Sequence, residues 1–358
     1  MLSCNLYAGD PAHPSRRENQ VIASAGSDLS ISMLRPGDFP LWDDLVSRSP
    51  HGTVFHYSWW LEATGCRFEI LVCRDEEGKL VAGIPLPRRR RAGLVLFHSP
   101  DVLTPFLGPV FDLSEAEYEY EKVTLMRERG ELLARAIDGY DSFSYGVGPS
   151  APDLQGFLWA GFRVELSYTF RFRPGGPPDG ILAGSSQEHQ RNLAKARRQG
   201  LNVVAGDDME SLVGLVQQTY RRQELVMPFE EDVLRRLAKV ARARGHAKVY
   251  LARTREGRFT AGLLVVHDGR SSYQLVAGGD PALRALGGGN LVEWEAIQES
   301  LAAGRAYDFE GSEIRGVERH YRRWGAVPTP TWRLERAGSV AGALARALRK
   351  FKSYRSAF

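Results

Sequence analysis

The chain has 358 residues, more than the usual single domain of about 100–200 residues, so its length predicts two domains or one domain built by duplication. Its composition, with 43% hydrophobic and 25% charged residues, is typical of globular proteins and excludes a fibrous or wholly disordered chain. The net charge of +4 suits an anionic cofactor or RNA without requiring either, and no apolar run is long enough to predict a membrane-spanning helix, so we expect a cytoplasmic protein.

The sequence lacks the signatures of several chemistries. Cys4, Cys66 and Cys73 are an odd number of cysteines without the spacing of metal ligands, so we expect neither a disulfide framework nor a metal site. The sequence contains neither a Gly-x-Ser-x-Gly elbow nor a Gly-x-x-x-x-Gly-Lys-Ser/Thr loop. Serine hydrolases, P-loop enzymes and zinc enzymes are therefore disfavoured.

The predicted elements begin after a leader. Residues 1–28 are rich in Ser, Ala, Pro and Asn and lack apolar periodicity, which predicts a flexible segment. The first half, residues 29–173, then opens with a strand over 31–34, a helix capped by Asp38 and a second strand over 68–73.

The hairpin that follows has a counterpart far downstream. Residues 74–84 and 253–263 share the pattern Arg-x-x-Glu-Gly-Lys/Arg-x-x-Ala-Gly-Ile/Leu, and Glu-Gly makes a tight turn between two apolar strands. A strand followed by a helix capped by Asp208 precedes the second copy, as in the first half, and segment 157–163 is weakly echoed by 321–326. Because these features recur in the same order, we predict a duplicated chain.

A segment rich in turn-forming residues separates the two halves. Residues 173–184 are rich in Pro and Gly and mark the boundary, which leaves 174–336 as the second half. Residues 337–358 predict a basic amphipathic helix that either packs as a terminal helix or rests on a membrane surface or RNA. Each half alternates helices with a long hairpin, so we expect an α/β fold of the α+β kind, with a central, mostly antiparallel sheet flanked by helices in each half.

Basic side chains gather in two interior segments. The run Arg88 to Arg91 lies between two predicted strands and is most simply a solvated loop, with contact to a phosphorylated acceptor as the alternative. A helix that opens the second half carries Arg191, Lys195 and Arg198 on one face, which suits an anionic ligand or tRNA.

A glycine-rich loop in the second half precedes an amphipathic helix. The loop contains Arg284, Gly287, Gly288 and Gly289, and Asn290 is the predicted N-cap of the helix. Glycines let backbone N–H groups approach a phosphate, and the helix dipole favours an anion at that end. The loop is either a phosphate-binding site, with Arg284 supplying charge, or a plain connector.

Two carboxylates follow on a predicted strand. Asp308 and Glu310 are two residues apart and should share one face, where burial would raise the pKa of either one toward neutrality. Glu310 is the preferred general base, while Asp308 is also explained as a brace for the following turn. Tyr307, Tyr321 and His320 are alternatives for moving the proton of the leaving group.

These segments together resemble the Fem-like branch of the GNAT acyltransferases, whose members carry two fused GNAT-like folds. The spacing Arg-x-x-Gly-x-Gly at 284–289 resembles the loop that binds the acyl-CoA pyrophosphate. The basic helix 190–200, the stretch 307–312 and the turn ending at Gly325 and Ala326 are also similar to that branch. The resemblance covers residues 30–335 and implies two fused GNAT-like halves, with the donor site in the second.

The sequence departs from the Fem ligases at one position. These ligases place a lysine in an aromatic-Lys-x-x-aromatic-Gly pattern, where it can stabilise charge on the reacting acyl group. Tyr321 stands at the corresponding position here and Arg322 follows it. An arginine can donate to an oxyanion, but its planar fork does not reproduce a compact ammonium.

We therefore expect an N-acyltransferase that moves an acyl or aminoacyl group from acyl-CoA or aminoacyl-tRNA to an amine of a small molecule or peptide, without a metal. The candidate catalytic residues are Glu310, Asp308, Tyr321 and Arg322. The alternative is a catalytically inactive Fem-like binding or scaffold protein in envelope or polysaccharide assembly, which the missing lysine favours and the complete glycine loop opposes.

Overall fold

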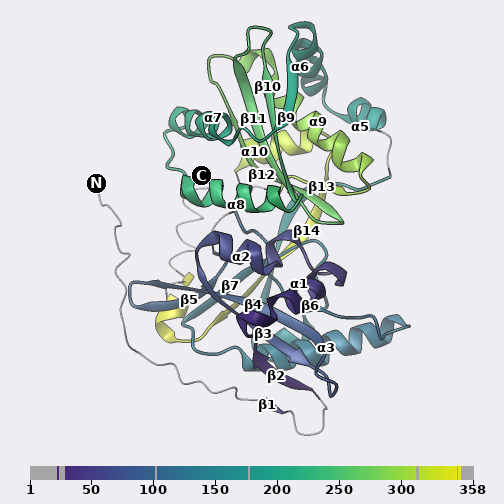
Figure 1. The fold of residues 1–358 in the computed structure, drawn as a ribbon, viewed down its shortest axis with the longest axis vertical. Coiled ribbons are helices and arrows are strands. Elements are labelled where there is room, and N and C mark those ends of the chain that lie inside the picture. The colour runs from purple at the N-terminus through teal and green to yellow at the C-terminus, as the bar shows by residue number, and fades with distance from the viewer. Residues whose placement is uncertain are drawn as a thin grey trace.

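The computed structural model describes residues 22–23, 29–100, 103–175, 178–311, 314–344 and 346–347. These residues form one 14-stranded sheet that runs through the molecule, with β6 paired to β4 off the main path. In Figure 1 the first half of the chain lies below and the second half above, and the sheet continues from one to the other. Among the described residues, no helix is both long and apolar enough to cross a membrane.

The first half packs helices on its part of the sheet. Its strands are β1 (Ile22–Ala23), β2 (Ser30–Met33), β3 (Arg67–Arg74), β4 (Leu80–Arg91), β5 (Leu94–His98), β6 (Val110–Phe111), β7 (Ser142–Val147) and β8 (Arg163–Phe172). Its helices are α1 (Phe39–Arg48), α2 (Ser58–Thr64), α3 (Glu119–Ala136) and α4 (Gln155–Trp159), with 3₁₀ turns η1 (Pro36–Asp38) and η2 (Val54–His56).

The second half repeats this order of strands and helices. Its strands are β9 (Asn202–Gly206), β10 (Ala247–Arg253), β11 (Phe259–His267), β12 (Ser271–Gly279), β13 (Ala306–Asp308) and β14 (Val327–Ala337). Its helices are α5 (Pro178–Gly184), α6 (Gln187–Arg198), α7 (Met209–Arg222), α8 (Glu231–Ala243), α9 (Gly288–Ala302) and α10 (Arg315–Arg323), with the 3₁₀ turn η3 (Arg284–Leu286).

The two predicted hairpins have the same backbone geometry. In β3–β4 the register shifts between Cys73 and Arg74, and in β10–β11 it shifts at the equivalent place, between Ala252 and Arg253. Both turns place their glycine in the left-handed region, with φ of 78° at Gly78 and 87° at Gly257. The two halves thus share the position of a register shift and the conformation of a turn glycine, as well as the order of their strands, as the predicted duplication implies.

The last strands of the two halves are exchanged. β8, at the end of the first half, pairs with β13 of the second, and β14, at the end of the second half, pairs with β7 of the first. β8 and β14 also pair with each other along their length, so the sheet order at the centre is β7-β14-β8-β13. The predicted boundary between 173 and 174 is therefore a boundary in the sequence only. In the sheet, β14 of the second half lies next to β7 of the first, and β8 of the first half lies next to β13 of the second.

A shared hydrophobic core joins the halves. Phe55 and Trp60 of the first half are fully buried against Leu237 of α8 and other residues of the second half. The guanidinium of Arg236 on α8 donates 2.6 Å from Nε to the carbonyl oxygen of Ala63 at the end of α2. Packing across the halves, together with the strand exchange, makes them one structural unit.

Three predicted segments differ in the structure. Arg88 to Arg91 were expected in a loop, but they form the end of β4 and pair with β5, because the turn comes only at Ala92 and Gly93, which have φ of 50° and 80°. Within the predicted leader, Ile22–Ala23 form β1 and pair with β2. Most of the predicted C-terminal helix lies outside the described residues, which show helix from residue 340.

Candidate active site

The parallel strands β12 and β13 separate soon after they meet. They pair only from Ser271–Ala306 to Tyr273–Asp308, although β12 continues to Gly279. Beyond Tyr273, β12 is paired only with β11 among the described strands. A pocket of about 270 Å³ lies beside the end of β12, between this strand and the start of α9.

The glycine loop shapes the start of α9. Gly287 has φ of 83°, and a Cβ there would lie 2.5 Å from the carbonyl oxygen of Asn192 on α6. A Cβ at Gly288 would collide with the hydroxyl of Thr260, whereas around Gly289 there is open space on the pocket side. The first two glycines thus permit close packing, and Gly289 leaves the helix end accessible to a ligand.

Asn290 does not have the role predicted for it. The N-cap of α9 is Gly287, and no side chain caps the helix. Asn290 lies inside the first turn, buried, where its Oδ1 accepts a hydrogen bond from Asn192 Nδ2 at 3.3 Å. Because no side chain caps the first N–H groups of α9, they remain available to an anion, as the glycine-loop interpretation requires.

Arg284 lies on the same pocket. It is in η3, immediately before the glycines, and its side chain is exposed. Its guanidinium makes no hydrogen bond or ion pair with the described residues. A full positive charge without an internal partner therefore lies beside a helix N-terminus, and Arg222 on α7 lines the same pocket.

A buried carboxylate, absent from the sequence prediction, also lines this pocket. Glu293 on α9 accepts hydrogen bonds from Trp324 Nε1 at 2.8 Å and from Gln274 Nε2 at 3.3 Å. Its Oε2 lies 2.7 Å from Nε2 of His320 on α10. The hydroxyl of Tyr307 extends the network by donating to Gln274 at 2.7 Å.

Glu293 and His320 stabilise each other's charged form. Burial opposes ionisation of Glu293, but the charge and hydrogen bond of His320 and the hydrogen bond of Trp324 hold the pKa of Glu293 below its ordinary value. Burial likewise opposes protonation of His320, and Glu293 outweighs it and raises the pKa of that imidazole. His320 and Glu293 thus form a hydrogen-bonded pair on the pocket wall, in which each favours the charged form of the other.

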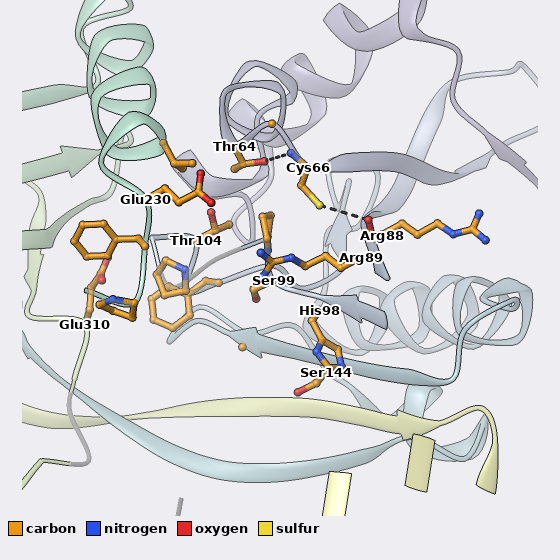
Figure 2. A pocket seen from close by; sticks show the side chains of 18 of the residues that line it. Thr64, Cys66, Arg88, Arg89, His98, Ser99, Thr104, Ser144, Glu230 and Glu310 are labelled. Atoms are coloured by element: carbon orange, nitrogen blue, oxygen red, sulfur yellow. Dashed lines mark hydrogen bonds between the residues drawn. The ribbon is translucent and has the colours of Figure 1, made fainter. Parts of the chain in front are cut away.

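A second and larger cavity lies between the halves. This groove has a volume of about 1270 Å³, and its floor is the polar face of the central strands β7, β14 and β8. Figure 2 shows its labelled side chains, which come from both halves of the chain. Its lining includes Thr104, Ser144, Ser167, Thr331, Arg333 and Glu310.

Glu310 lies where the groove meets the separated strands. It follows the end of β13 and has φ of 62°, a left-handed conformation that few non-glycine residues adopt. Its Oε1 is buried and has no hydrogen-bond partner among the residues that the structure describes. Burial and the neighbouring Asp308 raise the pKa of Glu310 well above its ordinary value, which is the property required of a general base that works near neutral pH.

Asp308 is fully buried and braces this turn. Its Oδ1 accepts hydrogen bonds from the hydroxyl of Thr169 and, at 2.8 Å, from the backbone N–H of Glu310. Its Oδ2 lies 3.2 Å from Nε of Arg171, and burial raises the pKa of Asp308 despite that cation. These contacts match the alternative role considered for Asp308, since the carboxylate holds Glu310 in its unusual conformation.

Tyr321 lines neither of the two cavities. Its ring stacks on Phe309 at 4.7 Å between centroids. Burial, followed by the charges of Glu293 and Glu310, raises the pKa of the Tyr321 phenol. The charges of a carboxylate from each cavity thus act on the pKa of this phenol.

The remaining predicted residues lie outside both cavities. Arg322 is exposed on α10 and pairs with Glu318 at 2.9 Å, one turn earlier, so the structure does not bring it to Glu310. On α6, Arg191 and Arg198 are exposed and Lys195 is half-buried. This helix contacts the glycine loop through Asn192, so its basic residues lie beyond the pocket itself.

The chain matches the family model of the GNAT acetyltransferase domain over residues 185–327, which include the glycine loop, Glu293, Glu310 and His320. No curated protein matches it. The described residues contain no cluster of three or more His, Cys, Asp or Glu arranged to hold a metal ion.

Several solved structures share the fold. The crystal structure of FemX is 13% identical with a TM-score of 0.63, and the match covers 84% of this chain and 96% of that one. The C-terminal domain (DUF2156) of a protein named as a lysylphosphatidylglycerol synthetase from Agrobacterium fabrum is 15% identical with a TM-score of 0.52, over 87% and 95% of the two chains. A conserved protein of unknown function from Bacteroides thetaiotaomicron is 9% identical with a TM-score of 0.52, over 85% and 98%. The predicted resemblance is confirmed, in sequence for the GNAT domain over residues 185–327 and in fold over 84% of the chain.

Proposed function

We propose, starting from a GNAT acetyltransferase domain at residues 185–327 within a FemX-like fold, that the protein transfers an acyl or aminoacyl group from acyl-CoA or aminoacyl-tRNA to an amine. The observation that carries this proposal is the uncapped start of α9, which opens with Gly288 and Gly289 on the wall of the smaller pocket. Beside it lies Arg284, whose guanidinium has no ion-pair partner among the described residues. Backbone N–H groups, a helix dipole and a guanidinium in one place favour a phosphate group of the donor.

The described part of the first half offers no such site at the equivalent helix. The helix that joins the parallel strands β5 and β7 of the first half is α3, the counterpart of α9. Its first turn contains Glu119 and Glu121, and Glu121 Oε2 already accepts the backbone N–H groups of Glu117 and Tyr118. A carboxylate thus occupies the position that a phosphate would need, so the first half contributes the groove rather than a second donor site.

The acceptor amine enters through the larger groove and meets the donor where β12 and β13 separate. The amine nitrogen attacks the acyl carbon, the C–N bond forms, and the C–S bond to CoA or the C–O bond to tRNA breaks. Glu310 takes the proton that the amine loses, and the hydroxyl of Tyr321 donates one to the leaving group. The basic side chains of α6, Arg191, Lys195 and Arg198, serve the outer phosphates of CoA or the backbone of a tRNA.

Reversing the charge at Arg284 tests the donor site. We expect Arg284→Glu to weaken CoA binding by about 10- to 100-fold, because a charge-assisted hydrogen bond to phosphate contributes roughly 1.5–3 kcal/mol. Calorimetric titration with CoA and acetyl-CoA measures this effect. The matched control is Arg258→Glu, an equal charge reversal on the exposed turn of the β10–β11 hairpin, outside the pocket, and it should leave CoA affinity unchanged.

The same proteins distinguish the donors. A gel shift with charged tRNA that is lost in Arg284→Glu, without any CoA binding, would assign the protein to aminoacyl transfer. Equal CoA affinity in the wild type and Arg284→Glu would remove the functional meaning of the glycine loop. If neither CoA nor tRNA binds the wild type, the scaffold alternative replaces the enzyme.

A further inference from the structure

The groove between the halves has opposite charges at its two ends. Its acidic side chains, Glu230, Asp232 and Glu310, all come from the second half. The first half supplies arginines from the start of β3 and the end of β4, and β14 on the floor supplies another; these are Arg67, Arg88, Arg89, Arg90 and Arg333. The second half adds one more arginine, Arg236 on α8, but its guanidinium donates to the carbonyl oxygens of Ala63 and Thr64. Figure 2 shows Glu230 and Glu310 on one side of the groove and Arg88 and Arg89 on the other.

The pairing of β4 directs Arg89 into the groove. Arg89 is opposite Leu96 on β5, so both side chains share a face with His98, two residues further along β5. His98 is in turn paired with Ser144 of β7, which lines the floor of the groove. In Figure 2 the Arg89 side chain extends toward Ser99 within the cavity, whereas the Arg88 side chain points away from it.

The basic end is built for an anion. Among the described residues no ion pair is recorded for Arg89 or Arg90, and both side chains are exposed. Arg333 lies on the floor of the groove, opposite Gly146 of β7. Guanidinium groups bind phosphate and carboxylate through paired N–H donors, which makes arginine better suited than lysine to hold such a group in one orientation.

The acidic end is built for an amine. Glu310 presents a buried carboxyl oxygen that has no hydrogen-bond partner in the described part of the chain, and Glu230 and Asp232 are exposed at the start of α8. Negative charge at this end attracts an ammonium group electrostatically, and Glu310 then accepts the proton that must leave before the nitrogen can attack. An acceptor with an amine at one end and an anionic group at the other would therefore lie along the groove in one orientation, with its amine at the acidic end.

We propose that the groove binds a zwitterionic acceptor, with its reacting amine at Glu310 and a phosphate or carboxylate group at Arg89 and Arg333. The assignment of the amine end rests on the proposed function, whereas the binding of the anion does not. An acceptor that carries only an amine lacks the interaction at the first-half end. Arg89 of the first half and Arg333 of the central strand β14 thus select the substrate, while the second half supplies the donor site and the base.

Binding measured without any donor tests the anion site apart from catalysis. The probes are a series of ω-aminoalkyl phosphates of increasing chain length, the ω-amino acids of matching length, and the amino alcohols that lack the anion. We expect the wild type to bind one length of the phosphates or the amino acids about 10- to 100-fold more tightly than the matching alcohol, and Arg89→Ala to lose that gain. Whichever series gains more identifies the anion as phosphate or as carboxylate.

A neighbouring arginine provides the matched control. Arg91 lies two residues further along the same strand, is exposed, and does not line the groove. Arg91→Ala removes the same charge and should keep the gain from the anion within about twofold, since only long-range electrostatics changes. Equal losses in Arg89→Ala and Arg91→Ala, or no gain from the anion at any length in the wild type, would overturn the proposal.

Transfer assays then separate the two proposals. If the anion binds as described and acyl transfer from acetyl-CoA occurs, Arg89→Ala should raise the KM for the acceptor and leave the affinity for CoA unchanged. If the anion binds but no amine is acylated from CoA or tRNA, the anion site stands and the proposed reaction fails.

Discussion

Replacing Glu310 by Gln should lower kcat by about 10²- to 10⁴-fold, the usual contribution of a positioned general base. The amide keeps the shape of the side chain and the left-handed backbone at residue 310, but it cannot take a proton from the amine. Burial and the charge of Asp308 raise the pKa of Glu310 well above its ordinary value, so the carboxylate form binds a proton readily. Because the donor pocket is separate from this carboxylate, the affinity for CoA should stay the same. Steady-state kinetics and a CoA titration measure the two effects.

The pH profile gives an independent check on the same residue. A base must be deprotonated to act, so kcat should rise with pH through the elevated pKa of Glu310, and this limb should disappear in Glu310→Gln. The control is Glu318→Gln on the outer surface of α10, which breaks only the pair with Arg322. Retention of wild-type kcat and of the same pH limb by Glu310→Gln would show that solvent or another group takes the proton.

Replacing Glu293 by Gln should destabilise the protein by about 3 kcal/mol, the lower end of the range for breaking a buried charge pair. The variant leaves the buried Nε2 of His320 without its anion and weakens the hydrogen bond from Trp324. The loss falls at the lower end because the His320 side chain is 37% exposed and water solvates it in part. Urea unfolding measures the change. The control is Glu299→Gln in the same helix, whose pair with Lys248 is on the surface and should contribute less than about 1 kcal/mol.

The contribution of this pair also depends on pH. The folded-state pKa of Glu293 lies below its ordinary 4.5, so its stabilisation is present above pH 4.5 and is lost as the pH falls through the lowered pKa. The folded-state pKa of His320 lies above its ordinary 6.5, so its stabilisation is complete below pH 6.5 and is lost as the pH rises through the raised pKa. The difference in unfolding free energy between the wild type and Glu293→Gln should therefore be largest between pH 4.5 and pH 6.5, the ordinary pKa values of the two groups. A difference that does not change with pH would contradict the assignment of an ion pair.

The repeated architecture was predictable because its signals are local. The two hairpins share a pattern within eleven residues, and the cap at Asp208 is confirmed by its Oδ1, which accepts the backbone N–H of Ser211 at 2.9 Å. The exchange of β8 and β14 was not predictable, since nothing within either strand specifies a partner more than 150 residues away. The run Arg88 to Arg91 was misassigned because charge is typical of loops, while an exposed strand end also tolerates it.

The candidate site was predicted in part for the same reason. Arg284 and the glycines are contiguous, and the structure brings them together on one pocket. Glu293 and His320 are 27 residues apart on different helices, so only the packing of α9 against α10 shows that they form a pair. The one signal in the sequence was that Glu293 interrupts the apolar pattern of a helix predicted to be buried. Burial of an unpaired carboxylate is costly, so a partner for Glu293 was to be expected.

The exchanged strands also govern when the protein can fold during synthesis. β7 receives its neighbour β14 only when residues 327–337 leave the ribosome, so the sheet of the first half waits for the end of the second. Contacts between distant segments of a chain form slowly, and incomplete sheet edges are prone to aggregate meanwhile. Two co-expressed fragments divided at the Pro- and Gly-rich segment near residue 175 would each carry a strand for the other's sheet, which suits the chain to split-protein complementation.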